Sequence, residues 1–293
     1  MIIPCHPRNR PTLNRALRSV EKAALGKDVE CIVVHDGDAR GLSWARNRGI
    51  ERASGDIIVF VDADDEVREN FFALFEELFS RGGVDFAISS FDFSPLKRQY
   101  NLEGNEEIVR TVAKAFFGYS FDDVRRWNRG GSLSAFREFG SVCRCAFSRE
   151  FLLDRGISFD ENLKVFEDSP FIAHAALFAG KVASSEEVVY KYSPAPGGLM
   201  MSSLKSRAFL DYKFAALRNR LALAEKAGGG VMEYFRGSAV FSLVELFCKR
   251  GDWRKYLSFP FVRESLDSFP LSLRRPAMFA CVVLLRLAAR LRR

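Results

Sequence analysis

The stretch GLSWARNRGIERASGDIIVFVDADD, residues 41–65, decides the fold. Its pattern predicts a helix over residues 43–53, a break at Ser54-Gly55 and a strand over residues 56–61. The run IIVFV lacks polar alternation, which is typical of a strand buried on both faces in a parallel sheet that helices cover. The stretch therefore predicts one helix–strand step of an α/β fold.

Three carboxylates, Asp62, Asp64 and Asp65, follow directly on this strand. Ligands of open α/β sheets bind beyond the carboxyl ends of the strands, and crowded carboxylates repel one another unless a cation or donor groups meet them. Hard oxygen ligands on a short turn suit Mg²⁺ or Mn²⁺ carrying a phosphate-bearing substrate. A solvated acidic turn, with Asp65 as the N-cap of the next helix and Glu66 in its first turn, explains the same residues.

Two further strands precede the stretch. Residues 1–4 and 30–34 are short apolar runs, and a helix is predicted between them over residues 12–25. Alternating strands and helices predict βαβ units and a parallel sheet. The second strand runs into Asp36-Gly37, which would place a carboxylate at the mouth of the sheet above a sharp backbone turn. An ordinary Asp-Gly turn is the alternative.

The remaining pattern extends this α/β arrangement and then turns helical. We expect helices over 70–81 and 106–117, a strand over 84–89, a mobile loop over 119–134, a last strand EVVYKY (187–192) within residues 182–192, and helices over 204–227, 231–249 and 277–292. The length allows one large α/β domain with a helical appendage. We therefore predict an α/β domain over residues 1–203 and a helical region over residues 204–293.

Glu167 and Asp168 stand just before a helix that Pro170 would begin. Acidic residues at a helix N-terminus are favourable through the helix dipole alone. Without further context, this pair favours that structural explanation.

Composition indicates a soluble globular protein, with 48% hydrophobic and 28% charged residues. The six cysteines are scattered, which favours free thiols in a reducing cytoplasm. No signal peptide precedes the first predicted strand, and the apolar run 277–285 is far below the ~20 residues of a spanning helix. We therefore expect a cytoplasmic protein, soluble or peripheral on the inner face of the membrane.

The net charge of +7 has a local source, because residues 271–293 carry six arginines and no acid. This segment favours an anionic surface such as phospholipid headgroups over nucleic acid, for which no recognition motif is present. In its last helix, leucines at 284, 287 and 291 share one side, next to an arginine stripe at 286, 290 and 293. Such a helix can lie on anionic lipid, or pack on the domain with its arginines solvated.

Taken together, these motifs resemble the family-2 glycosyltransferases of the GT-A fold. The resemblance covers about residues 1–203 and is carried by IIPC, VVHDGD, LSWARNRGI, VDADD and FEDSPF in that order. It implies an α/β fold with a mixed, mainly parallel sheet flanked by helices and followed by a C-terminal helical region. It also implies metal-dependent transfer of a sugar, usually with inversion, from a nucleotide donor such as a UDP-sugar to a hydroxyl of a glycan or lipid-linked glycan.

The resemblance also implies roles for individual residues. On the donor side it implies a base pocket near Pro4, a uracil contact for Asp36, a diphosphate or base contact for Arg46, loop pinning by Asn47 and a ribose or sugar contact for Asp62. Asp64 would bind Mg²⁺ or Mn²⁺ at the diphosphate. Asp168 would be the general base, with Glu167 as its helper.

The sequence departs from the family pattern in several places. The first turn reads CHPRN, Asp38 replaces a serine, Arg144 stands near the position of a usual lysine, and Tyr190-Lys191-Tyr192-Ser193 lacks its final arginine. Two rival functions share the strand-end acids. A nucleotidyltransferase would need a glycine-rich loop after the first strand, where this chain has PCHPRNRP. A catalytically silent binding module would not need the intact carboxylates at Asp62, Asp64 and Asp168.

Overall fold

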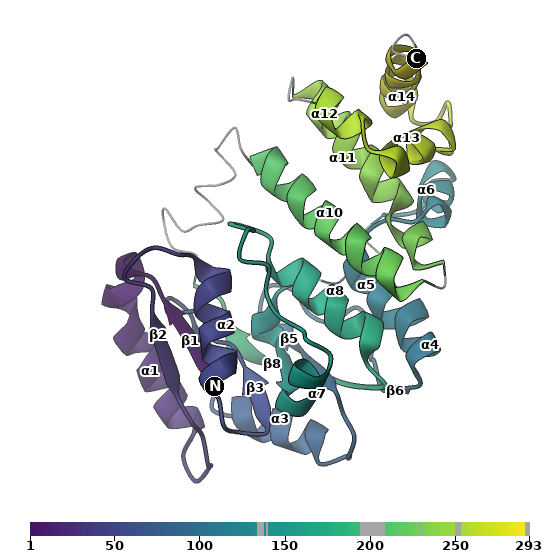
Figure 1. Cartoon of the computed structure of the whole chain (residues 1–293). Helices are drawn as coiled ribbons and strands as arrows, with labels where there is room; N and C mark the ends of the chain where they lie inside the picture. Colours follow the sequence, from purple (N-terminus) through teal and green to yellow (C-terminus); the bar gives the residue numbers. More distant parts are fainter. Residues whose placement is uncertain (134–137, 139, 194–208, 229, 250–252, 291–293) are drawn as a thin grey trace. The chain divides into compact units, whose positions relative to one another are not determined.

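The computed structural model describes residues 1–133, 138, 140–193, 209–228, 230–249 and 253–290. The chain divides into two units, one made of residues 1–116 and 138–206 and the other of residues 117–137 and 207–293 (Figure 1). The first unit contains the strands, and the second is helical. The predicted boundary at residue 203 lies outside the described residues.

The strands of the first unit form a mixed arrangement. Strand β1 (Ile2–Cys5) pairs in parallel with β2 (Ile32–His35) and bridges in parallel, through Ile2 and Phe60, to the end of β3 (Ile57–Val59). The second sheet has the order β3-β7-β5-β8-β4, with β6 beside β8. Its further strands are β4 (Glu66–Val67), β5 (Phe86–Phe91), β6 (Leu102–Glu103), β7 (Cys145–Ser148) and β8 (Lys181–Lys191).

The predicted mixed sheet with flanking helices is confirmed, although antiparallel pairing is more prominent than expected. Among the described strands of the second sheet, only β5 and β8 pair in parallel. Strand β7 lies antiparallel between β3 and β5, and β4 and β6 are antiparallel to β8. The helices of this unit are α1 (Arg10–Ala23), α2 (Leu42–Arg52), α3 (Phe71–Phe79), α4 (Asn105–Ile108), α5 (Lys114–Phe117), α7 (Arg149–Asp154) and α8 (Asp168–Phe178).

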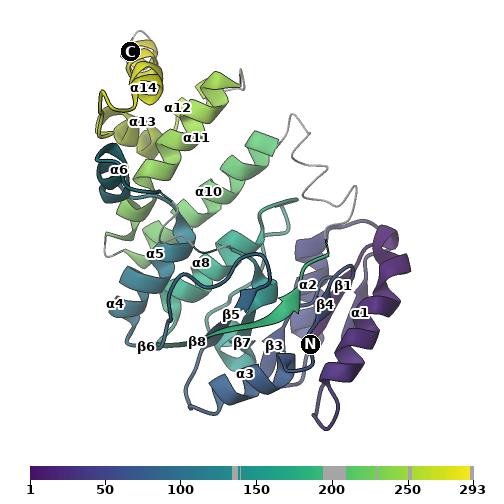
Figure 2. The same ribbon diagram turned by 180° about the vertical axis from the view of Figure 1, so that it is seen from behind.

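Helix α2 packs on β1 and β2, which Figures 1 and 2 show from opposite sides. Gly49 makes this close approach feasible, because a Cβ there would lie 2.3 Å from Cγ2 of Ile2. Below the helix, Phe60 is fully buried with its ring edge-on to Phe159 and Phe171. Packing on β1 and β2 thus positions α2, which carries Arg46 and Asn47.

The second unit is helical. Its elements are α6 (Phe121–Asn128), α10 (Phe209–Ala227), α11 (Arg236–Cys248), α12 (Trp253–Leu257), α13 (Pro260–Asp267) and α14 (Pro276–Arg290). The prediction of a mobile loop over residues 119–134 is wrong over the residues of α6. Ser120 and Asp123 build a capping box there, in which each side chain accepts the other residue's backbone N–H. Among the described residues, no helix has the length and apolarity to cross a bilayer.

Candidate active site

The side chain of Arg46 gathers three carboxylates from distant parts of the chain. Its guanidinium is 1% exposed. Nη1 donates to Oε1 of Glu167 at 2.8 Å and to Oδ1 of Asp168 at 2.5 Å, and Nη2 donates to Oδ1 of Asp62 at 3.0 Å. Asp62 follows β3, and the two other acids stand at the start of α8. We call these four residues the acid cluster.

The acid cluster carries more negative than positive charge, since one guanidinium faces three carboxyl groups. Burial, followed by the charge of Asp168, raises the pKa of Glu167 to about 8. Burial also raises the pKa of Asp168, although the positive charge of Arg46 opposes the shift. A site of this composition takes up protons or attracts a further cation.

The turn after β3 is fastened to the end of β8. The hydroxyl of Tyr190 accepts the backbone N–H of Asp62 at 3.0 Å and donates to Oδ2 of Asp65 at 2.8 Å. The backbone N–H of Ser193 donates to Oδ1 of Asp65 at 2.7 Å. Asp65 therefore caps no helix, because β4 follows it and α3 begins only at Phe71. The alternative explanation of this turn as a helix cap is excluded.

Asp62 pairs with Arg46 and Asp65 accepts two hydrogen bonds, whereas the carboxylate of Asp64 contacts no polar group of another residue among the described contacts. It is half-buried, and burial together with the charge of Asp62 raises its pKa. Among the described residues, no three His, Cys, Asp or Glu side chains are grouped as a metal site. The oxygen of Asp64 and the excess negative charge nearby nevertheless fit Mg²⁺ or Mn²⁺, provided that substrate phosphate and water supply most of the ligands.

Asp36 and Asn47 hold backbone segments around the site. Asp36 is 3% exposed, and its carboxylate accepts the backbone N–H groups of Arg40 at 2.7 Å and Gly41 at 2.8 Å. This closes the loop that leads into α2. The side chain of Asn47 exchanges two hydrogen bonds with the backbone of Phe159, at 3.0 and 2.9 Å. Both residues thus order loops beside the acid cluster.

The predicted donor-side residues lie on neighbouring elements but in different surroundings. Pro4 is buried in β1, paired in register with Val34 of β2. The side chain of Arg46 is enclosed by acids and by the rings of Phe60 and Phe159, with its Cζ 5.9 and 5.2 Å from their centroids. Its described hydrogen bonds go to protein carboxylates, so it acts as an internal counter-ion of the acid cluster.

The sequence analysis assigned no role to two residues of this site, Tyr190 and Cys143. Cys143 is 1% exposed, and burial and the charge of Asp62 raise the pKa of its thiol well above the usual value. It stands beside Val142, whose backbone N–H donates to Oδ2 of Asp168 at 3.2 Å. The Tyr-x-Tyr pattern at the end of a strand was the available signal for Tyr190, since alternate residues of a strand share a face.

Arg144 lies apart from the acid cluster. It is fully buried, its Nε donates to the backbone O of Ser89 at 2.8 Å, and its Nη1 lies 3.5 Å from Oε2 of Glu138. The hydroxyl of Tyr100 donates to the other oxygen of Glu138 at 2.9 Å. The position that resembled a family lysine therefore holds a buried structural ion pair.

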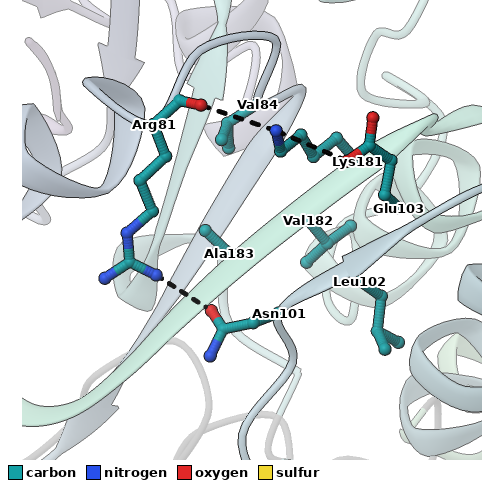
Figure 3. A pocket seen from close by; sticks show the side chains of 8 residues that line it. All are labelled: Arg81, Val84, Asn101, Leu102, Glu103, Lys181, Val182 and Ala183. Atoms are coloured by element: carbon teal, nitrogen blue, oxygen red, sulfur yellow. Dashed lines mark hydrogen bonds and ion pairs between the residues drawn. The ribbon is translucent and has the colours of Figure 1, made fainter.

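A shallow hollow lies at the other end of β8, and Figure 3 shows its lining. Its polar groups bond to one another. Arg81 donates to Oδ1 of Asn101 at 3.1 Å, and Nζ of Lys181 lies 3.6 Å from Oε2 of Glu103. These groups are satisfied within the protein, so the candidate active site remains the acid cluster and the adjoining turn.

The chain is similar in sequence to known proteins of one class. The family model described as glycosyl transferase family 2 matches residues 38–140. The uncharacterized glycosyltransferase EpsJ of Bacillus subtilis (strain 168) is 29% identical over 177 residues, which is 59% of this chain and 47% of EpsJ. The succinoglycan biosynthesis protein ExoO of Rhizobium meliloti (strain 1021) is 28% identical over 244 residues, or 80% of this chain and 68% of ExoO. The chain thus spans about half the length of EpsJ.

A solved structure shares the fold. Residues 1–349 of S. aureus TarS, crystallised with UDP-GlcNAc, superimpose with a TM-score of 0.58 at 16% identity. The match covers 98% of this chain and 80% of the TarS chain. This likeness confirms the predicted fold class.

Proposed function

The chain belongs to glycosyl transferase family 2 and has the GT-A fold, and on this premise we propose that it transfers a sugar from a nucleotide donor to a hydroxyl group of a glycan or lipid-linked glycan. The observation that carries the proposal is the acid cluster, which joins Asp62 to Glu167 and Asp168 beyond the end of a buried strand. A uridine diphosphate sugar is the proposed donor, as TarS was crystallised with one.

Asp168 is the proposed general base. Its side chain is 16% exposed, so it can reach a substrate while Arg46 and the backbone N–H of Val142 fix its two oxygens. It would take the proton of the acceptor hydroxyl as that oxygen attacks the anomeric carbon. The bond between that carbon and the diphosphate oxygen breaks in the same step, and the electron pair leaves with the nucleoside diphosphate. Attack from the face opposite to the leaving group inverts the anomeric configuration.

Asp64 is the proposed residue for holding a divalent cation, Mg²⁺ or Mn²⁺. Such an ion neutralises the negative charge of the departing diphosphate when it is bound. Glu167 and Arg46 would hold Asp168 in place, and Asp62 would contact the ribose or the sugar. The turn that carries Asp62 and Asp64 is held by Tyr190, which keeps both groups in register with the end of β8.

The rival functions predict different products and ligands. After β1 the chain forms a short 3-10 turn over Pro7–Asn9 and then enters α1, so the loop lacks the glycines of a nucleotidyltransferase phosphate loop. A nucleotidyltransferase would release pyrophosphate, a glycosyltransferase releases the nucleoside diphosphate, and a silent module would bind sugar-nucleotides without turnover.

The test is a panel of nucleotide sugars with Mg²⁺ or Mn²⁺, scored for release of nucleoside diphosphate. Asp168→Asn should lower the turnover by about 10²–10⁴-fold, the usual contribution of a general base, and leave donor binding intact. Asp64→Ala should weaken metal-dependent donor binding. The exposed Asp154→Asn is the matched control and should change neither. Near-normal transfer by Asp168→Asn would refute the base assignment.

We also propose a peripheral association of α14 with anionic lipid. Leu284 and Leu287 are 52% and 51% exposed on one side of this helix, and Arg290 is exposed one turn further on. Arg286 is not part of that surface, because its guanidinium donates to the backbone oxygens of Leu266 and Phe269. The predicted Leu291 and Arg293 lie outside the described residues.

Sedimentation with vesicles tests the lipid proposal. The full chain should pellet with phosphatidylglycerol vesicles and not with phosphatidylcholine vesicles, and Leu284→Gln/Leu287→Gln should reduce the pelleting. Leu153→Gln, which changes a leucine of similar exposure in the first unit, is the control. Point substitutions are preferable to deletion of α14, which would remove the buried Val282 and Leu285. Equal pelleting of all variants would disprove the association.

A further inference from the structure

Two aromatic side chains are exposed in contact with each other in the first unit. Phe93 is 50% exposed and Tyr192 is 40% exposed, and their ring centroids lie 5.2 Å apart. Phe93 is stacked on the buried Phe91 with centroids 5.3 Å apart and an interplanar angle of 14°. Contiguous exposed apolar surface is a feature of recognition sites, whereas single exposed apolar side chains are ordinary. We call Phe93 and Tyr192 the aromatic pair.

Strand pairing places the aromatic pair at the functional edge of the sheet. Strands β5 and β8 run in parallel, and Phe91 is the register partner of Tyr190. Phe93 and Tyr192 each follow that paired position by two residues, so they extend from the carboxyl ends of both strands. This is the edge at which ligands bind in α/β proteins.

The aromatic pair adjoins the acidic turn. The residue after Tyr192 is Ser193, whose backbone N–H donates to the carboxylate of Asp65 at 2.7 Å. Burial first, and then the charges of Asp65, Asp64 and Asp62, raise the pKa of Tyr192. Two exposed rings therefore stand beside the proposed reaction centre.

We propose that Phe93 and Tyr192 form a stacking platform for an uncharged pyranose ring of the acceptor. The proposal rests on the proposed function and adds to it the residues that bind the acceptor's sugar ring and the absence of charge on that ring. The C–H groups on one face of a pyranose are apolar and pack on aromatic rings, while its hydroxyls remain free for hydrogen bonds. An anionic acceptor is disfavoured, because three acidic residues, Asp62, Asp64 and Asp65, stand on the neighbouring turn.

The order of the strands assigns the platform to the acceptor and not to the donor. The proposed nucleotide pocket lies at the ends of β1 and β2, where Pro4 and Asp36 stand. Strands β3 and β7 separate β1 from β5 and β8. A donor with its base at β1 and its diphosphate at Asp64 leaves the region beyond the turn, where the aromatic pair lies, to the second substrate.

The test uses octyl glycosides of glucose, galactose and N-acetylglucosamine as probes of the full chain. Saturation-transfer NMR should show contact with the C–H protons of one ring face of at least one glycoside. Phe93→Ala and Tyr192→Ala should each weaken that binding about tenfold, equivalent to the energy of one aromatic contact. Tyr192→Phe keeps the ring and should retain the binding. The exposed Leu153→Ala is the surface control.

Titration with UDP separates failure of this proposal from failure of the proposed function. All variants should bind UDP as the wild type does, because the aromatic pair lies outside the nucleotide pocket. The platform alone would be overturned if UDP binding is normal and both alanine variants bind the glycosides as the wild type does. The same conclusion would follow if the wild type binds UDP but none of the glycosides. If the wild type does not bind UDP, the proposed function itself would be overturned.

Discussion

Two arginines of the first unit are fully buried, and they meet different numbers of acids. Arg46 bonds to Asp62, Glu167 and Asp168, whereas Arg144 pairs with Glu138 and a backbone oxygen. The acids raise the pKa of Arg46 well above its usual value against the effect of burial, and burial lowers the pKa of Arg144. One site is overloaded with negative charge and the other is close to balance.

The difference supports the proposal that the acid cluster is the functional site, whereas the Arg144 pair is structural. In a balanced buried ion pair, the two charges compensate each other within the fold. Additional buried carboxylates reduce stability, and they are found at sites where a reaction requires them. We expect the balanced pair to dominate stability and the acid cluster to dominate pH dependence.

Breaking the balanced pair should have the largest effect on stability. Arg144→Met leaves the carboxylate of Glu138 buried without its cation, which should lower the free energy of unfolding by about 3–5 kcal/mol. Urea denaturation measures this loss. The double variant Arg144→Met/Glu138→Met should recover part of it, because the uncompensated charge is gone. A loss below about 1 kcal/mol in the single variant would contradict the structural role of the pair.

The acid cluster should make the stability fall as the pH rises. The pKa of Glu167 is raised from 4.5 to about 8 in the folded protein, so the folded state holds this proton more tightly than the unfolded chain. The resulting stabilisation is complete below pH 4.5 and is lost as the pH rises through about 8. The decrease should be on the order of 3 kcal/mol.

Chemical denaturation in EDTA between pH 5 and pH 8 checks this expectation. Glu167→Gln should flatten the dependence and stabilise the protein at pH 8, because it removes one of the surplus charges. The exposed Glu150→Gln should keep the wild-type slope. If the dependence of stability on pH is the same in Glu167→Gln as in the wild type, the expected difference in pH dependence between the Arg46 and Arg144 sites would be contradicted.

The sequence was informative where the fold depends on local patterns. The buried strand before Asp62 and the acids before Pro170 were visible as an apolar run and as a helix start, and both lie at the acid cluster. The surroundings of Arg46 were not predictable, since its helix also carries the exposed Arg48 and nothing local separates the two. Only packing of α2 over Phe60 and Phe159 shows which arginine is enclosed.

Two other features, strand β7 and helix α6, were not predicted from the sequence. The first depends on long-range strand pairing, and the signal for the second was obscured by the composition of its segment. Strand β7 is four residues long and pairs with β3 and β5, which are far from it in sequence, so no local pattern fixed its place. Helix α6 lies in a segment rich in Gly, Arg and Asp that resembled a loop. Its capping box, Ser120 with Asp123, was present in the sequence and would have predicted a helix start.

The smallest expected effects come from two buried tyrosines, one at each arginine site. Tyr190→Phe leaves the backbone N–H of Asp62 without its acceptor, and Tyr100→Phe removes a donor to Glu138. Each should lower the free energy of unfolding by about 1–3 kcal/mol. Tyr190→Phe should also weaken metal-dependent UDP binding, because the turn with Asp64 is released from β8, whereas Tyr100→Phe should leave UDP binding unchanged. Equal UDP affinities in both variants would show that the acidic turn keeps its geometry without Tyr190, and the distinction between a functional and a structural site would then rest on charge alone.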